Sequence, residues 1–368
     1  MNDRQQTPDD AGTTTGNTLR GRQIADMLAY VLAPSDARPA ALPAPPPITT
    51  LLLHAGAGAL AWHCIRDNGV NATPAAGQLH QAYRLHTLQA ALKELEISQV
   101  FAYLRSHGLE PLLGKGWGIA RQYPELGLRP YGDIDLYVRP DQYHAVEAAL
   151  RGPGALGWNV DLHRGGAQLD DRDFAVLQAH AQRLPCNGVA VNVFGPEDHL
   201  RLLCLHMLKE GVLRPLWLCD IAVALRALPP DFDWTYFCSG DARRTDWAIC
   251  AIGLAHHILG AEVAGLPIAD RAKNIPSWMV PVVLREWGTG KSTKGRRTPM
   301  SVRLRRPMDT LHALRERWPN AIEATVGVHG PFNEWPRLPF QLGDCLRRMG
   351  EFAWQAPRLW RGEQIIMK

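Results

Sequence analysis

Two aspartates separated by one residue are the feature of this sequence that most directly suggests chemistry. Asp133 and Asp135 lie in the stretch GDIDLYV, where acidic and apolar residues alternate before an apolar end. Alternation with a period of two predicts a strand with one buried face, so both carboxylates point the same way, about 7 Å apart. Paired carboxylates suit Mg²⁺ (or Mn²⁺), which prefers oxygen ligands and keeps waters that a phosphate can displace. Such a pair also occurs at exposed strand edges, where the acids are only solvated.

The residues that precede these acids indicate a phosphate-binding site. Residues 112–113 can end a short strand, Gly114–Gly116 can turn, and Trp117 can open a helix whose free N–H groups face an anion. Lys115 is either a mobile charge for a triphosphate or an ordinary solvated lysine. Arg129 can hold a phosphate with two hydrogen bonds, although a salt bridge to a neighbouring carboxylate explains it equally well. The expected nucleotide contacts are Gly114, Lys115, Gly116, Trp117 and Arg129.

The stretch KGWGIARQYPELGLRPYGDIDLYV, residues 115–138, resembles a bacterial family labelled uncharacterised nucleotidyltransferase. That family is similar in turn to the nucleotidyltransferase superfold of the DNA polymerase beta type, which has a glycine-containing turn, a helix and a D-x-D strand. The likeness covers roughly residues 50 to 265. It implies a third carboxylate on a later strand, and Asp161 in GWNVDLH fits that position. The chain departs from the superfold at the usual Gly-Ser of the turn, which reads Lys115-Gly116, so the serine contact to phosphate is absent.

The resemblance implies an α/β (α+β) fold, a mixed sheet with flanking helices followed by a helical domain. It also implies metal-dependent transfer of a nucleoside monophosphate from an NTP to a hydroxyl-bearing acceptor, with release of pyrophosphate. Asp133, Asp135 and Asp161 would be both catalytic residues and metal ligands. The sequence does not show whether the acceptor is a small molecule, a peptide or a protein. The rival hypothesis is a noncatalytic protein of the same fold, in which the basic stretch 291–306 binds nucleic acid or another polyanion.

Three further features allow a functional and a structural interpretation. His163 shares the strand face of Asp161, and it either steadies the metal site as a hydrogen-bond donor or caps a strand end. Asp220 lies on an apolar helix face, where it is either a nucleotide contact or a buried acid paired with Arg214 or a backbone group. Residues 288–292, GTGKS, look like part of a P-loop but lack its first glycine, so we treat the match as fortuitous.

Composition limits the class of protein. A net charge of +4 over 368 residues is too small to imply nucleic acid by itself. The seven cysteines form no C-x-x-C pair, so neither a disulfide framework nor a zinc site is expected. The N-terminus is polar, and no apolar run of about 18 residues occurs. We therefore expect a cytoplasmic protein without a membrane partner.

The order of segments predicts five regions along the chain. Residues 1–18 have almost no apolar side chains and are expected to be a disordered tail. An N-terminal helical segment, 19–108, contains a proline-rich linker near 33–47, and its long helix carries Leu85, Leu88, Leu92, Leu95 and Ile97 as the apolar register expected to pack on the sheet. The catalytic core of about four or five strands spans 109–195, a helical domain spans 196–275, and a basic, Trp-containing helical region spans 276–368.

Overall fold

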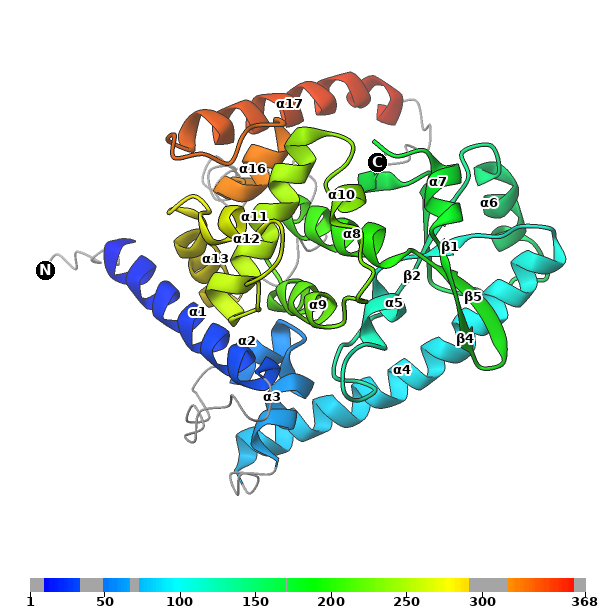
Figure 1. The fold of residues 1–368 in the computed structure, drawn as a ribbon, viewed down its shortest axis with the longest axis horizontal. Coiled ribbons are helices and arrows are strands. Elements are labelled where there is room, and N and C mark those ends of the chain that lie inside the picture. Colours follow the sequence, from blue (N-terminus) through cyan, green and yellow to red (C-terminus); the bar gives the residue numbers. More distant parts are fainter. Residues whose placement is uncertain (1–9, 34–48, 67–72, 170, 291–316, 361–368) are drawn as a thin grey trace, which may run out of the picture.

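The computed structural model describes residues 10–33, 49–66, 73–169, 171–290 and 317–360. These residues form a mixed α/β fold in which a five-stranded sheet lies beside a larger assembly of helices (Figure 1). The expected fold class is therefore confirmed. The basic stretch 291–306 and most of the proline-rich linker lie outside the described residues.

The sheet has the strand order β3-β2-β1-β5-β4. Its strands are β1 (Leu112–Leu113), β2 (Ile134–Val138), β3 (Val160–Arg164), β4 (Gln182–Cys186) and β5 (Val189–Val193). Strand β2 runs antiparallel to β1 and parallel to β3, β1 runs parallel to β5, and β4 and β5 form an antiparallel hairpin. The hairpin turns at Asn187-Gly188, where both φ angles are positive (47° and 77°), as a two-residue hairpin turn requires. The β2–β3 register pairs Asp135 with Asp161.

Helix α4 (Pro74–Ser106) extends from α3 to the sheet, and its C-terminal half lies beside the strands (Figure 1). The side that packs on the sheet carries Ala90, Ile97, Val100, Phe101 and Leu104, all buried. The expected register is wrong for the other four apolar positions: Leu85, Leu88, Leu92 and Leu95 are 49–61% exposed. The helix has apolar residues on two faces, and periodicity alone does not show which face meets the sheet.

The remaining helices pack mostly against one another. Three helices lie between strands along the chain: α5 (Gly116–Ala120) between β1 and β2, α6 (Tyr143–Arg151) between β2 and β3, and α7 (Phe174–Ala179) between β3 and β4. The helical part follows β5 with α8 (Pro196–Lys209), α9 (Pro215–Arg226), α10 (Trp234–Phe237), α11 (Ala242–Leu259), α12 (Ala269–Lys273), α13 (Met279–Gly288), α16 (Ala321–Gly327) and α17 (Leu338–Trp360). No helix among the described residues combines the length and the apolar character needed to cross a membrane.

The first of the N-terminal helices begins earlier in the chain than expected. They are α1 (Asp10–Leu32), α2 (Thr49–His54) and α3 (Gly58–Ile65), so residues 10–18 are helical and not a disordered tail. Helix α1 lies along α13 and not on the sheet (Figure 1). The backbones of the two helices come unusually close at two glycines. A Cβ added at Gly21 would lie 1.8 Å from the Leu284 carbonyl oxygen, and a Cβ added at Gly288 would lie 1.8 Å from the Asn17 carbonyl oxygen. This contact joins segments far apart in the sequence, so local composition does not reveal it.

Candidate metal centre

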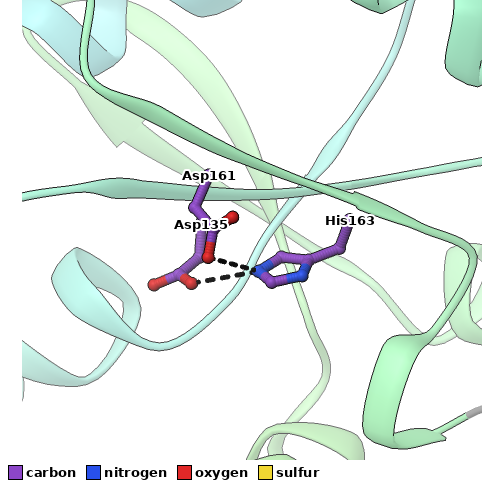
Figure 2. A group of neighbouring side chains, drawn as sticks. All are labelled: Asp135, Asp161 and His163. Atoms are coloured by element: carbon purple, nitrogen blue, oxygen red, sulfur yellow. Dashed lines mark hydrogen bonds and ion pairs between the residues drawn. The ribbon is translucent and has the colours of Figure 1, made fainter. Parts of the chain in front are cut away.

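Neighbouring strands bring two acids and one histidine together. Asp135 on β2 and Asp161 on β3 are register partners, and His163 lies two residues further along β3 on the same face. The imidazole Nε2 of His163 lies 3.2 Å from Asp135 Oδ1 and 3.2 Å from Asp161 Oδ2 (Figure 2). One potential ligand atom from each of the three residues lies within 4.8 Å of the other two. Carboxylate oxygens with an imidazole nitrogen suit a divalent cation, and the nitrogen makes the set at least as suitable for Mn²⁺ as for Mg²⁺.

Lys115 reaches this group from the turn after β1. Its Nζ lies 2.5 Å from Asp135 Oδ1, the same oxygen that His163 contacts. Both side chains of the ion pair are about nine-tenths buried, with 10% and 7% exposed. Lys115 is therefore a buried lysine paired with an acid of this group and not a solvated loop lysine.

The contacts around the two acids keep both of them ionised. Burial alone would raise the pKa of Asp135, but the hydrogen bond from His163 and the charge of Lys115 lower this pKa below its ordinary value. The hydrogen bond from His163 lowers the pKa of Asp161, against the effect of partial burial. Burial would lower the pKa of His163, but its hydrogen bonds to both carboxylates raise it. The site thus combines two carboxylates with the Lys115 ammonium and with an imidazole whose pKa is raised.

Asp133 is placed differently from the other two predicted acids. It is exposed and immediately precedes the first residue of β2. Among the described residues, the group of mutually close ligand atoms contains Asp135, Asp161 and His163 but not Asp133. The strand therefore presents Asp133 at its open end, two residues away from the acid that joins the cluster.

The glycine-containing turn is packed tightly beside the acids. The backbone N–H of Gly114 donates to the Asp135 carbonyl at 3.1 Å, which fixes the turn to β2. A Cβ added at Gly114 would lie 2.7 Å from Tyr137 Cε2, so no larger residue fits there without movement. Gly116 has a positive φ of 23°, and the buried indole of Trp117 donates from Nε1 to Glu94 on α4 at 3.0 Å. The turn is thus held by contacts on both sides.

Arg129 forms an ion pair with a buried carboxylate. Its Nε and Nη2 donate to Asp220 on α9 at 2.7–3.2 Å, and Nη1 donates to the Pro130 carbonyl at 3.3 Å. Asp220 also accepts the Tyr123 hydroxyl at 2.9 Å, and its side chain is fully buried. Of the two interpretations of Arg129, this geometry corresponds to the salt bridge. Of the two interpretations of Asp220, the geometry corresponds to a buried paired acid, but its partner is Arg129 and not Arg214.

Two aromatic residues near the acids were not singled out from the sequence as site residues. The ring of Tyr137 stacks on His163, with centroids 4.4 Å apart, and its buried hydroxyl has no hydrogen-bond partner among the described residues. His206 on α8 packs edge-on against Trp217, and burial lowers its pKa to about 3. The alternation along β2, which puts Tyr137 on the face of Asp135, is the signal that could have identified the tyrosine. His206 comes close only through packing of the helical part on the sheet.

Comparison with known proteins gives one match. Residues 45–260, more than half of the chain, match a family model described as uncharacterised nucleotidyltransferase. The matched span contains all five strands and every residue of the acidic cluster. Neither the curated proteins nor the solved structures contain a match.

Proposed function

Because the chain belongs to the uncharacterised nucleotidyltransferase family, we propose that it transfers a nucleoside monophosphate from an NTP to a hydroxyl-bearing acceptor and releases pyrophosphate. The acceptor would be a small molecule, a peptide or a protein. The observation that carries this proposal is the register pairing of Asp135 with Asp161, which sets two ionised carboxylates side by side at one end of the sheet.

The acidic group fits a divalent cation in its ligand chemistry. Asp135 and Asp161 would hold Mg²⁺ or Mn²⁺, with His163 beside them and Asp133 completing the set from the open end of β2. When bound, the ion would neutralise charge on the triphosphate and on the leaving pyrophosphate. The turn residues Gly114, Lys115, Gly116 and Trp117 would contact the phosphates, with Lys115 as their cation. Arg129 has no role in phosphate binding in this proposal, because its guanidinium is engaged by Asp220.

Asp161 is the acid best placed to meet an acceptor. Its side chain is 53% exposed, whereas that of Asp135 is 7% exposed. The acceptor oxygen would form a bond to the α-phosphorus while the bond from that phosphorus to the bridging oxygen of pyrophosphate breaks. The hydroxyl proton would pass to Asp161, the more exposed of the two carboxylates.

Calorimetric titration with each NTP, with Mg²⁺ and then with EDTA, tests the proposal. We expect one or more NTPs to bind only with the metal ion. Asp135→Asn should abolish this binding, whereas Asp141→Asn should preserve it, because Asp141 is an exposed acid paired with Arg139 and lies outside the cluster. Metal-independent binding, or unchanged binding by Asp135→Asn, would contradict the proposal.

The rival, a noncatalytic binding protein, is favoured by one observation. The Lys115 ammonium already neutralises Asp135, so the acids are compensated without any added ion. In that case the titration would show no metal-dependent signal with any NTP. Polyanion binding by the stretch 291–306 would then be the activity to measure.

A further inference from the structure

Lys115 adopts a backbone conformation that ordinary side chains avoid. Its φ is 48° and its ψ is −134°, a combination that glycine reaches freely and that a residue with a Cβ reaches only at a cost in folding free energy. A strained lysine in a buried turn therefore needs a compensating contact, and its side chain makes one with Asp135.

The ammonium group of Lys115 lies against an oxygen of the candidate metal-ligand set. Its Nζ lies 2.5 Å from Oδ1 of Asp135, and Asp135 belongs to the candidate ligand set. A divalent ion bound to that carboxylate would lie within a few ångströms of the ammonium, and two positive charges at such a distance repel strongly in a site screened from water. Lys115 and the metal ion consequently compete for one carboxylate.

We propose that Lys115 is a built-in counter-ion that occupies the metal position in the nucleotide-free protein and moves onto the triphosphate when a metal–nucleotide complex binds. The flexible four-carbon stem of lysine allows this exchange between two anionic partners without movement of the turn. The exchange makes metal binding depend on the nucleotide: free ions are disfavoured, and the metal–NTP complex is favoured. The nucleotide half of this inference rests on the proposed function, whereas the counter-ion half does not.

The counter-ion half is tested by Mn²⁺ alone, with free Mn²⁺ quantified by electron paramagnetic resonance in the absence of nucleotide. Lys115→Met and Lys115→Gly should each bind Mn²⁺ at least ten-fold more tightly than the wild type. Lys93→Met is the matched control, because Lys93 also forms an ion pair at 2.5 Å, with Glu96 on α4, outside the site. The control should bind Mn²⁺ as the wild type does. Equal or weaker binding by both Lys115 variants, or no Mn²⁺ binding by any of the proteins, would overturn the inference.

The two Lys115 variants also separate strain from charge. Both lose the ammonium, but only glycine relieves the positive φ, so Lys115→Gly should have the higher Tm of the two. If Lys115→Met fails to fold, the glycine variant still measures the metal affinity. Equal Tm values would contradict the strain argument.

The nucleotide half predicts the opposite change when NTP is present. With saturating Mn²⁺, NTP affinity should fall at least ten-fold in Lys115→Met and stay unchanged in Lys93→Met. If Mn²⁺ binding tightens as predicted but the wild type binds no NTP, the proposed function fails and the counter-ion role stands. If the wild type binds the metal–NTP complex and Lys115→Met binds it equally well, the transfer of the ammonium to the triphosphate is wrong.

Discussion

Removing the charge of Asp220 should destabilise the fold more than most single substitutions. Asp220→Asn keeps the size of the side chain but leaves the guanidinium of Arg129 buried without its counter-charge. Arg129 is 9% exposed and Asp220 is 0% exposed, so water cannot replace the lost partner. Breaking one side of a buried ion pair costs about 3–5 kcal/mol. We expect Asp220→Asn to lose stability in that range.

A double variant provides the control for this cost. In Arg129→Met/Asp220→Leu both charges are absent, and a buried pair replaced by apolar residues of similar volume is often close to neutral. The Tyr123 hydroxyl then lacks its acceptor, which costs about 1–3 kcal/mol for an unsatisfied buried group. The double variant should therefore be more stable than Asp220→Asn alone, even though it carries two substitutions.

Urea unfolding followed by fluorescence measures all three proteins. A loss below about 1 kcal/mol in Asp220→Asn would fall in the range of exposed ion pairs and would refute the argument from burial. NTP affinity of Arg129→Met gives a second check. A strong fall in affinity without loss of stability would show that Arg129 contacts phosphate and does not serve the fold.

Three further predictions concern packing, pH and chemistry. Gly114→Ala should cost about 1–3 kcal/mol in thermal unfolding, because the added Cβ would lie 2.7 Å from Tyr137, and the absence of any loss would contradict this packing. Burial lowers the pKa of His199 and of His206 from 6.5 to about 3 in the folded protein. Between pH 3 and pH 6.5 the unfolded chain therefore binds more protons than the folded one, so the free energy of unfolding falls as the pH drops below 6.5. Each imidazole contributes up to about 1.4 kcal/mol per pH unit, and His206→Gln should flatten the measured slope by that amount. Asp161→Asn should lower kcat by orders of magnitude, once an acceptor is found, with little change in NTP affinity, and equal losses of both would contradict its role at the acceptor.

The strands that carry the acids could be predicted because their signal is local. Alternation around Asp135 and around Asp161 predicts two strands with acids on one face, and both strands are present. The Asn187-Gly188 pair likewise predicts a hairpin by its preference for positive φ. Each of these features depends on residues within a few positions of one another.

The contacts across the fold could not be predicted, because they join residues far apart in the sequence. Arg129 and Asp220 are 91 positions apart, and the sequence around neither residue indicates which residue it pairs with. The pairing of Lys115 with Asp135 depends on a glycine-like backbone at a lysine, which the sequence gives no reason to expect. On α4, apolar residues on two faces left the buried side undetermined until the sheet was in place.

The close pairing of α1 with α13 affects the order of events during synthesis. About 250 residues separate the end of α1 from the start of α13. At about 5–20 residues per second, a ribosome needs roughly 12–50 s to make that interval. During that time Ile24, Met27 and Leu28, which are fully buried in the finished protein, lack the surface that α13 provides. Helix α1 therefore leaves the ribosome well before the helix that covers part of its apolar surface.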